Sequence, residues 1–383
     1  MKKNRNVIFL GLTSLFTDIS SEMMFPILPL FLSSTLGLNK AFIGLIQGIA
    51  EGTSSILKFV SGYISDKVKK RKAIVTLGYT LSNLSKPLLS MVTNGYEALA
   101  LRFTDRVGKG IRDAPRDALL SESTKKRGSA FGLQTSLDTL GAAIGNILAF
   151  LLLYYVTSNY RDIFKYSLIP GLIAILIVSL FVKDVKLKTQ KKYKLKKIKL
   201  SKKFKLFLFI SSLFSFANIS YAFFILKAQD LSVTAALIPI VYLVYNIVYS
   251  LTAYPIGRYS DKHSKVLILG IGYLLFSLVS LGFALASSSA LVWLLFAMFG
   301  VHMAIYKSVS RAFVSDLIPK REHGTGFGVY HTTVGLSLLP GNFLAGMLWD
   351  KFGSTYTFLF ASILSVLACI SLITLFRREL KKT

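Results

Sequence analysis

The sequence contains twelve largely apolar stretches of membrane-spanning length. The first, second, fourth and tenth of them contain charges, so the count of twelve depends partly on the charge pattern of the connections between them. A membrane-spanning helix needs about 20 mainly apolar residues, and hydrophobic residues make up 53% of the 383-residue chain. Only 17% of the residues are charged, whereas a soluble domain carries about 25%. We therefore expect an all-α membrane protein with twelve transmembrane helices. No signal-peptide cleavage site follows the first stretch, so we expect this stretch to be retained as the first helix. The stretches are 7–33, 41–65, 73–93, 97–117, 129–156, 163–182, 205–228, 233–256, 265–286, 290–312, 325–349 and 354–376.

The basic residues alternate from one connection to the next. The two termini and every second connection hold 32 of the 46 lysines and arginines, and the other connections hold only five: Lys40, Arg161, Lys165, Lys227 and Lys351. Such an alternation places the basic connections and both termini in the cytoplasm. The formal net charge of +28 therefore indicates topology and attraction to the anionic inner leaflet, and we expect no nucleic-acid partner. The composition suits a prokaryotic inner (cytoplasmic) membrane.

A lysine-rich segment, 183–205, divides the stretches into six and six. It carries twelve lysines and a single acid, Asp184. We expect a cytoplasmic linker that lies partly on the inner leaflet. The predicted domains are an N-terminal six-helix bundle over 1–182 and a C-terminal six-helix bundle over 206–383.

The two halves repeat one another. Gly62-Tyr-Ile-Ser-Asp66-Lys67 matches Gly257-Arg-Tyr-Ser-Asp261-Lys262 at an offset of 195 residues, and Gly145-Asn146 matches Gly341-Asn342 at an offset of 196. Arg116 aligns with Arg311 at the first offset. Several matches near one offset indicate a tandem duplication of a six-helix unit.

Short motifs in both halves resemble a family signature. The loop pattern G-x-x-x-D-[RK]-x-G-[RK]-[RK] fits the loops after the second and eighth stretches, with Lys69 and Ser264 at the second glycine position. The pattern R-x-x-q-G fits Arg106-Val-Gly-Lys109-Gly110, with lysine in place of glutamine, and Asp18 followed by Pro26 and Pro29 resembles the first-helix motif. With the twelve stretches and the repeat, the chain resembles the major facilitator superfamily of secondary transporters over essentially its whole length.

The resemblance implies two six-helix bundles that expose a central site to each side of the membrane in turn. It also implies a gate, in which Asp66 latches onto the start of the eleventh helix near Gly324, with Arg116 or Arg127 as its cationic partner. The alternative is that Asp66 and Asp261 merely cap their loops. The residues that we assign to gating are Asp66, Lys67, Arg112, Asp113, Arg116, Asp261 and Arg311.

The fourth stretch carries a charged stripe. Its charges at positions 102, 105, 106, 109, 112, 113 and 116 recur at three- and four-residue steps, so one face of a helix carries them all. In a membrane bundle such a face must lie against protein or a water-filled cavity. We read it as the wall of a transport pathway; a structural ion network is the alternative.

From the rise per residue of a helix, we expect Asp18, Glu51 and Lys86 to lie at about the same depth in the membrane as Arg106 and Lys109. A proton-coupled transporter needs a carboxylate whose protonation follows opening and closing of the site. The proton-coupling residues that we predict are Asp18, Glu22, Glu51 and Asp105, with Asp138 as an outside choice.

The C-terminal half is aromatic instead of ionic. Tyr242, Tyr245, Asn246 and Tyr249 form a helical stripe, which lines the pathway or packs against neighbouring helices. Together the halves suit an organic molecule with a charged group and an apolar body. The predicted substrate-binding residues are Arg106, Lys109, Arg102, Lys86, Tyr242, Asn246, Asn218, Tyr221 and His302.

These patterns predict a secondary transporter that exchanges protons for a small charged or amphiphilic organic compound, in the direction of export. The alternatives are an importer or facilitator of an organic anion, and a transporter of a metal ion or metal chelate. Four histidines without HxxxH spacing and the single Cys369 disfavour a soft-metal site. The motifs G-x-x-x-x-G-K-[ST], H-E-x-x-H and G-x-S-x-G are missing, which argues against an enzyme. We expect no cofactor, and a monomer whose partners are the substrate, protons and anionic lipids.

Overall fold

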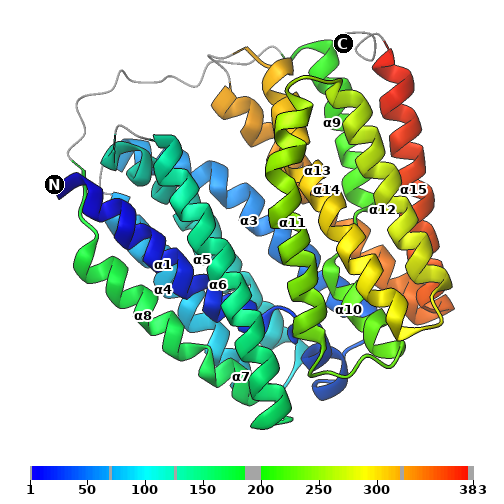
Figure 1. Cartoon of the computed structure of the whole chain (residues 1–383), viewed down its shortest axis with the longest axis horizontal. Helices are drawn as coiled ribbons and strands as arrows, with labels where there is room; N and C mark the ends of the chain where they lie inside the picture. The colour runs from blue at the N-terminus through cyan, green and yellow to red at the C-terminus, as the bar shows by residue number, and fades with distance from the viewer. Residues whose placement is uncertain (1, 69–70, 125–126, 186–199, 320–322, 378–383) are drawn as a thin grey trace. The chain divides into compact units, whose positions relative to one another are not determined.

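The computed structural model describes residues 2–68, 71–124, 127–185, 200–319 and 323–377. These residues form an all-helical protein without a strand in the described ranges, as the sequence predicts. Within the described ranges, the helices and the short turns between them make twelve successive passages, and Figure 1 shows them coloured along the chain. Their bounds are α1 Lys2–Met24, α2 Leu28–Leu30, α3 Lys40–Val68, α4 Arg71–Leu88, α5 Gly95–Ser123, α6 Arg127–Tyr155, α7 Tyr160–Tyr166, α8 Leu168–Phe181, α9 Lys202–Ala217, α10 Tyr221–Asp230, α11 Ile238–Ser260, α12 Lys265–Leu285, α13 Ser289–Leu317, α14 His323–Phe352 and α15 Ser354–Leu375, with a π-helix η1 at Phe31–Thr35 and a 3₁₀-helix η2 at Leu89–Met91.

Three of the twelve passages are broken within the membrane-length stretch. The first is interrupted at residues 25–27, before α2 and η1, where Pro26 has no backbone N–H to give to a helix. The sixth consists of α7 and α8, which meet at Ser167, and the seventh is unwound between Ala217 and Tyr221. Discontinuous helices of this kind are typical of transporter binding regions.

Eight helical passages in the described residues are long and apolar enough to span a membrane. The long helices α3, α4, α5 and α14 do not meet this criterion. In α5 the reason is its charge, since seven charged side chains fall between Arg102 and Arg116. Such helices are recognised as spans from their neighbours and the alternating connections, more than from their own hydropathy.

Contacts divide the chain into two units. Unit 1 comprises residues 1–31 and 53–197, and unit 2 comprises residues 32–52 and 198–383. The division assigns the first part of α3 to unit 2 and the rest of α3 to unit 1. The predicted linker is described only at its ends, since residues 186–199 lie outside the described ranges.

In unit 1, close approaches between helices use small residues. The helices α1, α4 and α8 lie side by side (Figure 1), and α6 packs along α1. A Cβ on Gly141 would lie 2.5 Å from the carbonyl oxygen of Leu15, and one on Gly145 would lie 2.7 Å from that of Ile19. Small residues at such crossings allow membrane helices to pack backbone against backbone.

In unit 2, the interior is aromatic. Phe214 of α9 stacks on Tyr273 with ring centroids 3.9 Å apart, and Phe224 of α10 lies 4.9 Å from Phe299 of α13. The start of α3 packs on α14 through glycines, because a Cβ on Gly44 would lie 2.1 Å from the carbonyl oxygen of Asn342. Unit 2 is therefore held by ring packing and by close helix crossings at glycines.

Candidate functional site

The charged stripe lies on the buried face of one continuous helix, α5. Asn94 caps this helix by accepting a hydrogen bond from the Glu97 N–H at 3.0 Å. Arg102 and Arg106 are buried, whereas Phe103 between them is 46% exposed. The structure therefore confirms the helix and the shared face of the charges. That these residues contact substrate stays a prediction.

Asp105 is the centre of the first group of charges. Its carboxylate accepts hydrogen bonds from Arg102 Nη1 at 2.9 Å and from Ser82 Oγ of α4 at 2.7 Å. Arg106 Nε lies 3.5 Å from the same carboxylate. Both guanidinium groups also lie over the ring of Phe25, at 5.2 and 4.9 Å from its centroid. A carboxylate between two arginines balances buried charge, and Phe25 belongs to the break in the first passage.

Lys86 of α4 is a fully buried cation close to this group. Its ammonium donates a hydrogen bond to Asn83 Oδ1 at 2.9 Å and approaches the carbonyl oxygen of Thr17 at 3.4 Å and Ser20 Oγ at 3.5 Å. All three acceptors are uncharged, and within the described ranges no carboxylate oxygen is recorded within 4 Å of this ammonium. An arrangement of this kind supplies positive charge to an anion more readily than a closed ion pair does.

A second group of charges follows along α5. Asp113 forms an ion pair with Lys58 of α3 at 2.9 Å, and the Arg112 guanidinium lies 4.3 Å from the ring centroid of Tyr79. Arg116 pairs with Asp117 at 2.9 Å and reaches Ser14 of α1 at 3.4 Å. These pairs join α5 to α3, α4 and α1, so each predicted gating residue of this group has a partner inside unit 1.

The acids of α1 face α6. Asn146 Nδ2 donates a hydrogen bond to Glu22 Oε2 at 3.2 Å and a second one to the carbonyl oxygen of Ala142 at 2.8 Å. Asp18 interacts electrostatically with Asp138 and with Lys109 of α5. The predicted residues Asp18, Glu22 and Lys109 are therefore brought together with Asp138. Asn146 is not among the predicted site residues. The sequence feature that points to it is the Gly-Asn pair that recurs in both halves.

The remaining predicted residues of the N-terminal half lie elsewhere. Glu51 is on the first part of α3, which groups with unit 2. The side chains of Asp66, Lys67 and Arg127 are outside what the structure describes, so the latch that Asp66 would form near Gly324 stays a prediction. Asp261 is the C-terminal cap of α11, and Arg311 Nε donates a hydrogen bond to the carbonyl oxygen of Lys307 at 2.7 Å.

The tyrosine stripe forms a ladder of rings on α11. Tyr242 lies 5.4 Å from Tyr221 of α10 and 5.2 Å from Tyr245, measured between ring centroids. Asn218 caps the end of α9 at the break in the seventh passage, three residues before Tyr221. The ladder thus begins beside an unwound segment, where the predicted residues Asn218, Tyr221 and Tyr242 are near one another.

His302 lies inside the aromatic core. Its side chain is fully buried, Nδ1 makes a hydrogen bond of 2.8 Å with the carbonyl oxygen of Gly272, and the rings of Phe276 and Tyr306 are 4.9 and 5.9 Å away. These are the surroundings of a packed core residue. Its predicted contact with substrate has no support from this environment.

Two side chains of α14 hold the parts of unit 2 together. Asn342 Oδ1 accepts a hydrogen bond of 2.7 Å from the Ser220 N–H, which lies in the break of the seventh passage. Asp350 caps the start of α3, since its two carboxylate oxygens accept hydrogen bonds from the Lys40 and Ala41 N–H groups at 2.9 and 2.8 Å. A carboxylate at a helix N-terminus satisfies backbone donors and complements the helix dipole.

Comparison with known proteins establishes the family. The family model described as "Major Facilitator Superfamily" matches residues 10–208 and 206–383, nearly the whole chain. The chain belongs to the major facilitator superfamily. It is a transporter and not an enzyme, as the sequence predicts.

Some of the similar proteins are named for a transport role, and others are uncharacterised. An uncharacterised MFS-type transporter of Methanocaldococcus jannaschii is 39% identical over 97% of this chain and 94% of its own. The multidrug resistance protein MdtH of Aeromonas hydrophila is 24% identical over 89% and 87%. The crystal structure of the nucleoside transporter NupG superposes with a TM-score of 0.80 at 13% identity, covering 97% of this chain and 99% of that one. The last similarity shows the fold alone.

Proposed function

We propose that this major facilitator transporter exports a small charged or amphiphilic organic compound in exchange for protons. The observation that carries the proposal is the buried ionic face of α5, where Asp105 lies between Arg102 and Arg106 and accepts a hydrogen bond from Ser82 of α4. Charges at membrane depth are costly and are typical of substrate and ion pathways. In this proposal, the cations Arg102, Arg106, Lys109 and Lys86 attract the charged group of the substrate. Unit 2 contributes uncharged groups from Asn218, Tyr221, Tyr242 and Asn246, and His302 is left out because it is fully buried in the aromatic core.

The acids of α1 are the proposed proton carriers. Glu22 accepts a hydrogen bond from Asn146, and Asp18 interacts with both an acid, Asp138, and a base, Lys109. A carboxylate between an acid and a cation changes protonation when either neighbour moves. We also propose that Asp105 contributes to proton coupling by changing its pairing with Arg102 and Arg106 during transport. Glu51 of α3 is a further proposed proton-coupling residue.

Export gains limited support from the relatives. The similarity to a multidrug resistance protein favours efflux over uptake. The orientation that we propose follows the alternating basic connections, with both termini in the cytoplasm and the chain in the cell's inner membrane.

We propose that the first part of α3 moves during transport. It is packed on α14 at Gly44 and Gly48 and capped by Asp350, whereas the rest of α3 is joined to α5 through Lys58 and Asp113. Asp350 thus acts as a latch on the side of the membrane away from the termini, and Asp66, Lys67, Asp261 and Arg311 act on the side of the termini. The Asp350→Asn variant keeps one side-chain acceptor for the start of α3 but loses the charge. In a Lys40→Cys, Cys369→Ser background, it should therefore increase labelling of the new cysteine by a thiol reagent. Unchanged labelling would contradict the latch.

Proton movement in liposomes tests the proposed coupling. Reconstituted protein should acidify or alkalinise the lumen when a substrate gradient is applied, and the Glu22→Gln and Asp18→Asn variants should lose this movement. Asp162→Asn is the matched control, because this acid lies at the start of α7 and is paired with Lys165. Substrate transport that moves no protons under any gradient would contradict the coupling.

A facilitator or importer of organic anions is the second candidate. Lys86 favours it, since this buried cation is surrounded by neutral acceptors. Anion uptake that needs no proton gradient and is lost in Lys86→Met would favour this alternative. For a metal substrate there is no such observation, since the described residues hold no group of three or more histidine, cysteine or acidic side chains arranged for a metal ion.

A further inference from the structure

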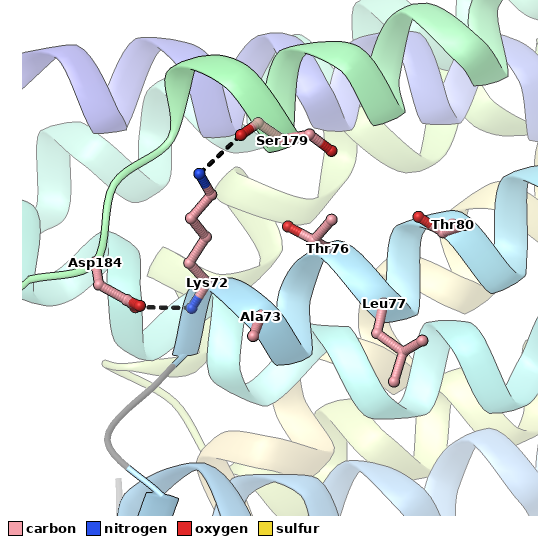
Figure 2. A pocket seen from close by; sticks show the side chains of 7 residues that line it. All are labelled: Lys72, Ala73, Thr76, Leu77, Thr80, Ser179 and Asp184. Carbon is pink, nitrogen blue, oxygen red and sulfur yellow. Dashed lines mark hydrogen bonds between the residues drawn. The ribbon is translucent and has the colours of Figure 1, made fainter.

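A groove runs along the outer face of α4 near the start of this helix. It is a shallow, open groove with a volume of about 540 Å³. Its lining comes from Lys72, Ala73, Thr76, Leu77 and Thr80 of α4 and from Ser179 and Asp184 at the end of α8 and just after it (Figure 2). These residues all belong to unit 1. The opposite face of α4 holds Gly78 against Gly108 of α5, so the groove is separate from the charged stripe.

Lys72 and Asp184 provide two opposite charges at one end of the groove. Lys72 Nζ donates a hydrogen bond of 2.7 Å to the carbonyl oxygen of Ser179, and the Lys72 N–H donates one of 2.8 Å to Asp184 Oδ1 (Figure 2). An ammonium has three donors and a carboxylate has two oxygens, so both groups retain capacity for a ligand. The length of the lysine side chain separates the two charges.

Hydroxyl groups continue the polar lining along α4. Thr76 and Thr80 follow Lys72 at four-residue steps, which places the three on one face of the helix. Thr76 Oγ1 is buried, and no hydrogen-bond partner for it occurs in the part of the chain that the structure describes. A rotation about the Cα–Cβ bond of Thr76 would bring this hydroxyl to an acceptor that enters the groove.

The surroundings of the groove are apolar and exposed. Leu77 is 53% exposed, and Leu176 and Leu180 of α8 are 55% and 66% exposed. In a membrane-spanning chain such side chains contact acyl chains. The basic residues of 67–72 and of 183–205 place this end of α4 where lipid head groups lie. A ligand for this groove therefore combines a polar head with an apolar body.

We propose that the groove binds the head group of an aminophospholipid, with the phosphate at Lys72 and the primary ammonium at Asp184. A purely anionic head group would meet the Asp184 carboxylate next to Lys72, which is unfavourable. A trimethylated head group has no N–H to donate to a carboxylate. A head group with both a phosphate and a primary ammonium satisfies both side chains and leaves its acyl chains on Leu77 and Leu180.

Delipidated full-length protein in detergent tests the proposal with three lipids of equal acyl chains: phosphatidylethanolamine, phosphatidylcholine and phosphatidylglycerol. The melting temperature and the bound lipid, measured by native mass spectrometry, should rise most with phosphatidylethanolamine, since a ligand that binds the native state stabilises it. Asp184→Asn retains the acceptor for the Lys72 N–H, so the fold is kept, and it should remove the preference for phosphatidylethanolamine over phosphatidylcholine. Lys72→Gln should weaken binding of all three lipids about tenfold, the effect of one charge-assisted hydrogen bond.

Two further variants make the result decisive. Thr76→Val keeps the shape of the side chain and should weaken lipid binding without lowering the lipid-free melting temperature. Lys165→Gln, on the exposed surface of α7, should change neither quantity. An equal response to all three lipids, a preference for phosphatidylglycerol, or a preference for phosphatidylethanolamine that survives in Asp184→Asn would overturn the proposal.

Discussion

The repeated Gly-Asn pair occupies matched places in the two units but meets different partners. Gly145 of α6 packs on the backbone of α1 at Ile19, and Gly341 of α14 packs on the backbone of α9 at Phe216. The asparagine that follows each glycine bonds to its own helix four residues earlier, at Ala142 or Leu338. Asn146 then donates to a carboxylate, Glu22, whereas Asn342 accepts from a backbone N–H, that of Ser220.

This difference shows how a duplicated unit can divide its roles. The glycine preserves a backbone crossing that both units need for packing. The asparagine side chain can donate or accept, so the same residue orients an ionisable group in unit 1 and satisfies an unwound backbone in unit 2. In our account, the ionisable residues of the transport pathway therefore lie in unit 1, whereas the matching asparagine of unit 2 stabilises a helix break within an aromatic core.

The largest expected effect is in the ionic interior of unit 1. Asp105→Ala removes the carboxylate shared by Arg102 and Arg106, and breaking a buried pair costs about 3–5 kcal/mol. The free energy of unfolding in detergent should fall by about this amount. Asp162→Ala, which removes a partly exposed pair, should change it by less than about 1 kcal/mol; equal effects of the two variants would argue against a closely paired ionic core.

A smaller loss is expected at the backbone contact of unit 2. Asn342→Ala leaves the Ser220 N–H without its acceptor, and an unsatisfied buried donor costs about 1–3 kcal/mol. The same unfolding measurement checks this value, with Leu336→Ala, at an exposed position of α14, as the control. If Asn342→Ala is no more destabilising than the control, the side chain does not support the break.

The smallest change in stability is expected at Glu22, together with a clear change in function. Glu22→Gln keeps the size of the side chain and an oxygen that can accept from Asn146, so the free energy of unfolding should change by less than about 1 kcal/mol. The variant has no titratable group at this position, so the dependence of the transport rate on pH should flatten. The transport rate as a function of pH in liposomes, compared with that of Asn342→Ala, checks this expectation; a wild-type profile in Glu22→Gln would mean that Glu22 carries no proton.

The sequence predicts the regular parts of this molecule well. The twelve passages follow from apolar length and alternating connections, and the buried face of α5 follows from the spacing of Arg102, Asp105 and Arg106. These features depend on the periodicity of one helix at a time, which a sequence shows directly.

Other features depend on contacts between distant residues, and the sequence does not show them. The cap that Asp350 places on Lys40 joins residues 310 positions apart, and the grouping of Glu51 with unit 2 depends on glycine packing between α3 and α14. The break after Ala217 is stabilised by Asn342, which lies 122 residues beyond Ser220. A local pattern of asparagine and serine is compatible with a loop or a helix until that partner is known.

Ligand-induced stabilisation tests the central claim, that the charged face of α5 receives the substrate. The melting temperature of the wild type, Arg106→Ala and Tyr306→Phe would be measured in detergent against a library of organic ions at two pH values. Tyr306 lies in the aromatic core of unit 2 and serves as the matched control. Organic anions that bind the native state should raise the melting temperature of the wild type and of Tyr306→Phe, with no rise in Arg106→Ala above its own ligand-free value. Stabilisation that persists in Arg106→Ala would contradict the claim and would place the substrate away from this face of α5.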